Sequence, residues 1–237
     1  MRNCLTRIRT NMKPPIYHRM FSYNLSLLPN PQLAVLENGV NNIDDARKKS
    51  GATIGYPGWG LIYHLLLSHL DRNRSEVIVE TGTNWGCTTI VLAQALIDAG
   101  CTGRVITFEL EPENLTRATD NLIAARVADR VELHLGDSRI ELSMALEQVR
   151  GVRFAFLDAS HLYNDVMREF EIVLPKLADD ALVIFDNTYL IANEGEDSRV
   201  NGALKEILFK HGGNLINLEF VSWYTPGLAV WQRKPKL

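Results

Sequence analysis

Hydrophobic residues from position 76 onward form short β-rich runs that alternate with stretches of helical spacing. The runs predict buried strands at 76–80, 104–109, 131–135, 154–158 and 181–185. Apolar residues three and four positions apart predict helices between and after these strands, at about 88–99, 112–125, 140–149, 165–174 and 200–211. This alternation predicts an α/β fold in which right-handed crossovers build a parallel sheet with helices on both faces.

Two β-rich runs at the end of the chain depart from that alternation. Residues 215–224 and 228–233 follow each other with only Thr225-Pro-Gly227 between them. A connection this short predicts an antiparallel pair, so the parallel sheet should end in a hairpin. An ordinary dinucleotide-binding domain lacks such a hairpin.

The composition is that of a globular protein. Of 237 residues, 46% are hydrophobic and 22% are charged, which argues against disorder, collagen and coiled coil. The net charge of −3 gives no general reason to bind nucleic acid. No apolar run reaches the roughly 18 residues that span a bilayer. Cys4, Cys87 and Cys101 match neither a disulfide framework nor a zinc pattern, which indicates reduced thiols inside a cell. Taken with the charge and the lack of a spanning run, this predicts a soluble, cytoplasmic protein that binds neither nucleic acid nor membranes.

The first 36 residues differ from the rest in charge. They contain five basic residues and no acidic one, whereas the remainder holds 20 basic and 28 acidic residues. We interpret residues 1–50 as an N-terminal arm and residues 51–237 as the domain that contains the sheet. A transit peptide is an alternative, but Pro14-Pro15 and Pro29-Asn-Pro31 interrupt any long amphipathic helix. An arm that packs on a neighbouring subunit or over an active site is favoured, so we expect a homo-oligomer, a dimer or larger.

A glycine-containing loop follows the first predicted strand, and ligands of open α/β sheets bind beyond the carboxyl ends of the strands. The loop runs Glu80-Thr-Gly-Thr-Asn-Trp-Gly86, and its two glycines let the backbone and helix amides approach a ligand. Asn84 stands where a Gly-x-Gly-x-x-Gly motif has its second glycine, which disfavours a nicotinamide dinucleotide. The loop also lacks the Gly-Lys-Ser/Thr sequence of a P-loop.

Acidic residues follow the second and third predicted strands. Glu109 ends the second strand, where a carboxylate can accept hydrogen bonds from both ribose hydroxyls of an adenosine-containing cofactor. Gly136-Asp137-Ser138 ends the third strand, where Asp137 could accept a hydrogen bond from an adenine amino group. The alternative for Asp137 is the N-cap of the next helix.

The fourth and fifth predicted strands end in residues that suit metal-assisted chemistry. Asp158, Asp186 and Asn187 would present two carboxylates and an amide carbonyl from adjacent strand ends. These hard oxygen donors suit Mg²⁺, or Ca²⁺ and Mn²⁺ with less selectivity; a simple polar turn is the alternative for Asp186 and Asn187. His161 is a candidate general base near neutral pH, with a structural role as its alternative.

Together these motifs resemble the class I S-adenosylmethionine-dependent O-methyltransferases, over roughly residues 52–233. Within that class the chain is similar to the metal-dependent type, which includes catechol and caffeoyl-CoA enzymes and macrolide-sugar enzymes of the macrocin and mycinamicin type. Asp158 with the later Asp186-Asn187 pair matches the catechol branch, whereas His161 matches the sugar branch. The resemblance implies a Rossmann-like class I methyltransferase fold for 51–237, with a mostly parallel seven-stranded sheet, helices on both faces and a C-terminal antiparallel hairpin.

The resemblance also implies a role for each candidate residue. The methionine part of the cofactor would be lined by Glu80, Gly82 and Gly86, the ribose by Glu109 and the adenine by Asp137. Further cofactor contacts are expected from the same loops and from the fourth strand: Thr83, Asn84, Thr88, Ser138 and Asp158. The divalent metal would be held by Asp158, Asp186 and Asn187. The catalytic residues would be His161 and Asp158.

These assignments predict an enzyme that moves a methyl group from S-adenosylmethionine to a hydroxyl of a small molecule, with a divalent metal and a histidine base. A phenol, a sugar and another natural product are all possible acceptors. The alternatives are a metal-independent methyltransferase and a non-catalytic S-adenosylmethionine-binding protein. Six aromatic residues could wall an acceptor pocket or belong to the core instead: Tyr56, Trp59, Tyr163, Tyr189, Trp223 and Tyr224.

Overall fold

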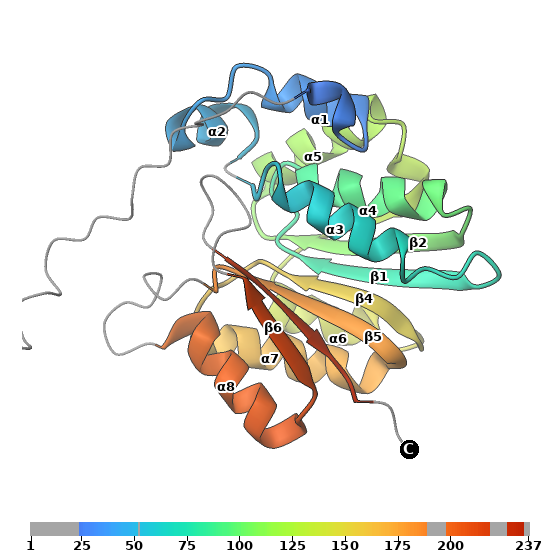
Figure 1. Ribbon diagram of the computed structural model, residues 1–237, viewed down its shortest axis with the longest axis vertical. Helices are drawn as coiled ribbons and strands as arrows, with labels where there is room; N and C mark the ends of the chain where they lie inside the picture. The colour runs from blue at the N-terminus through green and yellow to red at the C-terminus, as the bar shows by residue number, and fades with distance from the viewer. Residues whose placement is uncertain (1–23, 52, 189–197, 219–226, 235–237) are drawn as a thin grey trace, which may run out of the picture.

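A seven-stranded sheet forms the centre of the computed structural model, which describes residues 24–51, 53–188, 198–218 and 227–234 (Figure 1). The strand order is β3-β2-β1-β4-β5-β7-β6. The strands are β1 (Ser75–Thr81), β2 (Thr102–Glu109), β3 (Val131–Leu135), β4 (Val152–Leu157), β5 (Leu177–Asp186), β6 (Asn214–Leu218) and β7 (Leu228–Gln232). The pairs among β1 to β5 are parallel, whereas β7 pairs antiparallel with both β5 and β6. The predicted parallel sheet with an antiparallel end is therefore confirmed.

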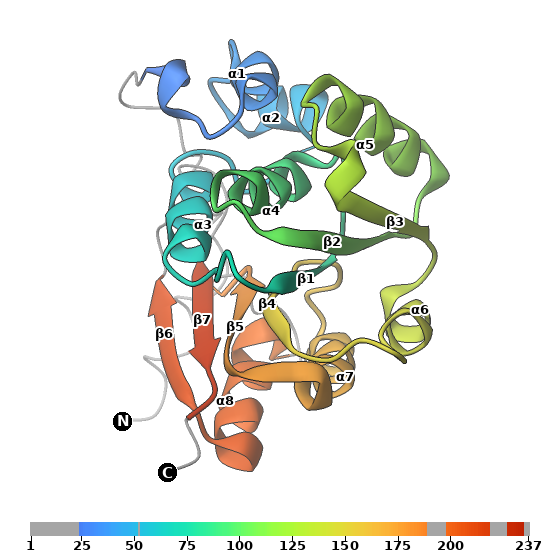
Figure 2. The ribbon, with the colours of Figure 1, turned by 90° about the vertical axis from the view of Figure 1, so that its right-hand side faces the viewer.

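Helices cover both faces of this sheet, as Figure 2 shows. One face carries α1 (Pro31–Glu37), α3 (Gly58–Leu67), α4 (Cys87–Asp98) and α5 (Pro112–Ala124), with α2 (Ile43–Lys49) beside α1. The other face carries α6 (Ser138–Ala145), α7 (Tyr163–Val173) and α8 (Arg199–His211). Three short 3-10 turns complete the described elements, at Leu25–Leu27, Ala128–Arg130 and Leu174–Lys176.

The pleat of the strands divides the core into two hydrophobic clusters. Ile78 and Ile184 point toward the α3–α4 side, whereas their neighbours Val79 and Val183 point toward the α6–α8 side. Successive strand residues alternate between the two faces, and both faces are covered, so the strands are apolar along most of their length. Nine of the twelve residues of α4 are buried, because this helix lies between the sheet and α3.

The described part of the predicted N-terminal arm, residues 24–50, packs on this core. Leu33 of α1 is fully buried in the first cluster. The Asn30 side chain caps α1 and also donates to Gln94 Oε1 at 2.8 Å and to the Ala125 carbonyl at 3.1 Å. Helix α3 follows this segment, and its Trp59, Ile62 and Leu66 are fully buried. The boundary between residues 50 and 51 stays a prediction.

Three predicted elements differ from the structure in extent. The strand expected at 181–185 is β5, which begins four positions earlier, at Leu177. The helix expected at 140–149 is α6, which ends at Ala145; turns then continue its apolar spacing and bury Leu146 and Val149. The strand expected at 215–224 is β6, which is described as far as Leu218; residues 219–224 lie outside the described part. Within the described residues, no helix has the length and apolar character needed to cross a membrane.

Candidate active site

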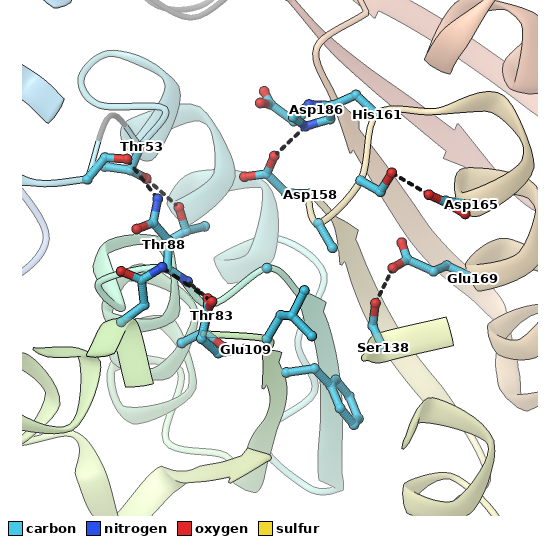
Figure 3. Close-up of a pocket in the computed structure, with 18 of the residues that line it drawn as sticks. Thr53, Thr83, Thr88, Glu109, Ser138, Asp158, His161, Asp165, Glu169 and Asp186 are labelled. Carbon is cyan, nitrogen blue, oxygen red and sulfur yellow. Dashed lines mark hydrogen bonds and ion pairs between the residues drawn. The ribbon is translucent and has the colours of Figure 1, made fainter. Parts of the chain in front are cut away.

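A cavity of about 780 Å³ opens at the carboxyl ends of the parallel strands. Its walls include residues that follow or end β1, β2, β3, β4 and β5, together with Arg47, Gly51, Thr53 and Ile54 from the N-terminal segment. Figure 3 shows polar side chains from these separate elements facing one space. The parallel arrangement brings all five strand ends to the same edge, which is where ligands of open α/β sheets bind.

The loop after β1 has a backbone that requires glycine at Gly82. The backbone N–H groups of Gly82 and Thr83 both donate to the Phe108 carbonyl of β2 at 3.0 Å. Gly82 has φ +81°, and a Cβ there would lie 2.3 Å from the Asp158 carbonyl oxygen. The loop and the end of β4 therefore approach each other as closely as the backbone allows.

We expect Gly82→Ala to lower the free energy of unfolding by about 3 kcal/mol or more, because it adds left-handed strain and a backbone clash. Gly100→Ala is the matched control. Gly100 has φ +69° but nothing within 4 Å of an added Cβ, so this change should cost about 1 kcal/mol. Urea denaturation measures both values. Equal losses for the two variants would contradict the close approach at Gly82.

The structure explains why asparagine can occupy position 84, where a Gly-x-Gly-x-x-Gly loop has its second glycine. Its φ is 51°, in the left-handed region that asparagine tolerates better than most residues. Its side-chain amide donates to the Gly51 carbonyl at 2.7 Å, and its backbone N–H donates to Glu109 Oε2 at 2.6 Å. Asn84 thus joins the N-terminal segment, the glycine loop and the end of β2.

Two predicted cofactor residues already have protein partners at the cavity. Glu109 Oε1 accepts hydrogen bonds from the Glu111 backbone at 2.9 Å and the Asn114 amide at 3.3 Å. Asp137 is the N-cap of α6 and accepts from the Arg139 backbone N–H at 2.9 Å. The hydrogen bond from the Arg139 guanidinium lowers the pKa of Asp137. Both side chains line the cavity, so the N-cap role of Asp137 and a contact with adenine are compatible.

Asp158, His161, Asp186 and Asn187 come together as predicted. His161 Nε2 lies 3.2 Å from Asp158 Oδ1, and the Asn187 amide nitrogen lies 2.9 Å from the His161 ring nitrogens. One potential ligand atom from each of Asp158, His161 and Asp186 falls within 4.8 Å of the others. Asp186 Oδ1 is buried and has no hydrogen-bond partner among the described residues. This cluster could hold a divalent cation through oxygen donors and one nitrogen donor.

Burial shifts the protonation of these groups. It raises the pKa of Asp158 to about 8 and, together with the nearby charge of Asp158, raises the pKa of Asp186 well above its usual value. Burial also lowers the pKa of His161. Two carboxylates with raised pKa and a neutral imidazole are a combination found at catalytic and metal sites.

The structure places the remaining predicted residues in two groups. The residues that line the cavity are Gly82, Thr83, Asn84, Thr88, Ser138 and Asn187. Glu80 and Gly86 are not among them: Glu80 Oε2 accepts from Thr89 at 2.5 Å and from Thr107 at 2.7 Å behind the loop, and Gly86 caps α4. Their contacts with the cofactor stay predictions.

The six aromatic residues have mixed positions. Trp59 is fully buried in the core, and none of the described ones lines the cavity. Tyr189, Trp223 and Tyr224 lie outside the described residues.

Sequence reasoning missed several cavity residues. Thr53 lies with its Oγ1 3.1 Å from Thr88 Oγ1, and Arg139 bridges Asp137 and Asp165. Glu169, in the middle of α7, is 1% exposed and also lines the cavity. Only Glu169 had a usable sequence signal, because it falls on the apolar face of its helix.

The seven-stranded sheet with this strand order, and a site along the ends of β1 to β5, define the class I methyltransferase fold. Residues 79–188 match a family model described as a methyltransferase domain. A catechol O-methyltransferase of Mycobacterium tuberculosis is 35% identical over 112 residues, which cover 46% of this chain and 47% of that protein. The chain thus spans about half the length of the curated relative that it matches.

Solved structures confirm the fold over most of the chain. The O-methyltransferase TomG from Streptomyces achromogenes, solved with S-adenosylmethionine, has a TM-score of 0.69 at 21% identity and covers 85% of this chain and 89% of its own. An O-methyltransferase from Bacillus cereus, solved with S-adenosylhomocysteine, has a TM-score of 0.69 at 22% identity. That match covers 91% of this chain and 94% of the Bacillus cereus chain. The chain therefore has a class I methyltransferase fold, residues 79–188 of it match a methyltransferase domain model, and its resemblance to the O-methyltransferases is confirmed.

Proposed function

We propose that this chain is an S-adenosylmethionine-dependent O-methyltransferase that methylates a hydroxyl of a small molecule. The observation that supports this most is the cluster of Asp158, His161, Asp186 and Asn187 in the same cavity as the glycine loop. The 35% identity to a catechol O-methyltransferase supports the same reaction class. A divalent cation would be held by Asp158, Asp186 and Asn187. Asp186 Oδ1, which has no hydrogen-bond partner in the described part of the chain, fits such a ligand.

In the proposed mechanism, the cofactor and the cation supply the methyl group and the Lewis acid, and the protein positions the reactants and accepts the proton. When bound, the cofactor supplies a methyl group on a sulfonium, and the cation lowers the pKa of the acceptor hydroxyl and orients it. The His161 imidazole would accept the proton of that hydroxyl, which would make the hydroxyl oxygen the nucleophile toward the methyl carbon. Asp158 Oδ1, 3.2 Å from His161 Nε2, would stabilise the imidazolium. The cavity walls mainly align the reacting atoms, which is the proximity contribution to the rate.

Titration calorimetry with S-adenosylmethionine, with and without Mg²⁺, tests this function. We expect binding to the full chain, followed by methyl transfer to a hydroxylated acceptor; catechol is the first acceptor to try. Absence of cofactor binding under both conditions would refute the proposal. Transfer that a chelator does not reduce would support a metal-independent enzyme, and cofactor binding without transfer to any hydroxylated acceptor would support a non-catalytic binding protein.

The assembly and location of the chain belong to the same proposal. A homo-oligomer in the cytoplasm, in which the N-terminal segment contacts a neighbouring subunit, agrees with the basic first 36 residues. Light scattering coupled to size-exclusion chromatography would give the mass, and a monomer at micromolar concentration would contradict the oligomer.

A further inference from the structure

The cavity is rich in carboxylates, and most of them have a partner that offsets their charge. Six acidic residues line it: Glu109, Asp137, Asp158, Asp165, Glu169 and Asp186. Three N–H donors surround Glu109. The guanidinium of Arg139 pairs with both Asp137 and Asp165. The pair formed by Asp158 and Asp186 is the proposed cation site.

Glu169 differs from these carboxylates in its partners. Among the described residues, its hydrogen bonds come from two neutral hydroxyls: Ser138 Oγ donates to Oε1, and Thr81 Oγ1 donates to Oε2 at 3.0 Å. Its charged neighbours Asp137 and Asp165 are also acidic. Figure 3 shows the carboxylate directed at Ser138, on the same side of the cavity as Asp165. Hydroxyl donors stabilise a carboxylate without cancelling its charge.

The fold holds this charge in a fixed position. Glu169 follows Val166 by three positions and precedes Val173 by four, so it lies on the apolar stripe that packs α7 on the sheet. Its side chain is only 1% exposed. A buried, uncompensated carboxylate is costly unless a ligand uses it, because burial disfavours the charged form.

We infer that Glu169 sets the preference of the cavity for the cationic cofactor, S-adenosylmethionine, over its product S-adenosylhomocysteine. This inference rests on the proposed function. The two molecules differ by a methyl group and by the positive charge on sulfur, so a negative wall favours the cofactor and leaves the neutral thioether almost unaffected. In general, two opposite unit charges at a separation on the order of 10 Å, in a medium with an effective dielectric constant of about 20, change an affinity by about tenfold. The same difference would favour release of product after transfer.

Glu169→Gln removes the charge and keeps the shape. A glutamine amide can still accept from one hydroxyl and donate to the other, so both hydrogen bonds can persist. Glu171→Gln, an exposed position on the same helix, is the matched control for the loss of one negative charge. Glu169→Asp keeps the charge on a shorter side chain, and Glu169→Asn is its neutral counterpart.

Calorimetric titration of each full-length variant with both ligands tests the inference. Burial raises the pKa of Glu169 to about 7, so the titrations are run at pH 8, where the carboxylate is charged. For Glu169→Gln we expect about tenfold weaker binding of S-adenosylmethionine and a change of less than twofold for S-adenosylhomocysteine. Glu171→Gln should change neither affinity, and Glu169→Asp should keep the wild-type ratio of the two.

Several outcomes would overturn the inference. Equal weakening of both ligands would show that Glu169 only holds the cavity in shape. Should Glu169→Gln fail to fold, the comparison of Glu169→Asp with Glu169→Asn replaces it: the same ratio of the affinities for the two ligands in both variants would overturn the inference. Equal affinity of the wild type for the two ligands would overturn it as well. A wild-type chain that binds neither ligand would refute the proposed function itself, which separates that failure from a failure of Glu169 alone.

Discussion

Replacing His161 by alanine is expected to lower kcat by about 10²-fold or more while the affinity for S-adenosylmethionine stays the same. The imidazole lies beside Asp158 and Asn187 in the cavity, and burial lowers its pKa, so it is neutral and able to accept a proton near pH 7. An alcohol or phenol is a poor nucleophile until its proton is removed. Steady-state kinetics with catechol as the first acceptor, and cofactor titration by calorimetry, measure the two effects separately.

His64→Ala is the control for this variant. His64 is an exposed residue of α3 that packs against Tyr63 and does not line the cavity. We expect it to leave both kcat and cofactor affinity unchanged. A fully active His161→Ala enzyme would contradict the base role. A loss of Mn²⁺ affinity of tenfold or more in the same variant would instead assign His161 to the cation, since its nitrogen lies within the cluster of potential ligand atoms.

The strand ends were predictable from the sequence because topology, not loop detail, brings them together. Parallel strands place their carboxyl ends at one edge, so residues that follow different strands converge even when they are far apart in the chain. Glu109, Asp137, Asp158 and Asp186 all reached the cavity for this reason. The side-chain partners of each one depend on local packing, and strand periodicity contains no information about that.

An arm over an active site was one of the expectations, but the particular N-terminal residues at the cavity were not predictable. Gly51 accepts a hydrogen bond from Asn84, and Thr53 lies against Thr88, across more than thirty positions of sequence. No periodic pattern in the sequence links these residues.

Glu169 is a different case, because its sequence signal was present. An acid in a helix is usually solvent-exposed. The spacing of Val166, Phe170 and Val173 shows, however, that position 169 falls on the buried stripe of α7. An acidic residue at a core position of an amphipathic helix is a candidate for function, and helical phase can detect it without a structure.

Asp186→Asn is expected to stabilise the metal-free protein while it impairs the enzyme. Asp186 and Asp158 are neighbouring carboxylates, the pKa of each is raised, and Asp186 Oδ1 has no hydrogen-bond partner among the described residues. Asparagine has nearly the same shape and is neutral at every pH, so it avoids the cost of burying a second carboxylate charge. At pH 8, without a divalent cation, we expect Tm to rise by about 2 to 4 °C, which corresponds to about 1 kcal/mol for a chain of this size. We expect kcat to fall by about 10²-fold or more.

The pH dependence of stability follows from the raised pKa values of Asp158 and Asp186. A carboxyl group whose pKa is raised on folding binds more protons in the folded state, so its contribution to stability is complete below pH 4 and is lost as the pH rises toward about 8. Metal-free wild-type protein should therefore lose stability over this window, and the advantage of Asp186→Asn should disappear near pH 4 to 5. Scanning fluorimetry across pH 4 to 8 would measure both trends.

In the presence of a divalent cation, we expect the wild type to have a higher Tm than Asp186→Asn, the reverse of the metal-free order. The cation binds the folded state and raises the Tm of the wild type, whereas Asp186→Asn lacks one of the oxygen ligands and should respond much less. Asp179→Asn, at an exposed position of the same strand, is the control and should behave as the wild type does at every pH and cation concentration. A lower Tm for metal-free Asp186→Asn at pH 8, with an undiminished response to Mg²⁺ or Mn²⁺, would mean that these carboxylates are structural. The chain would then stabilise its charge pair without a cation, and metal-independent transfer would become the favoured mechanism.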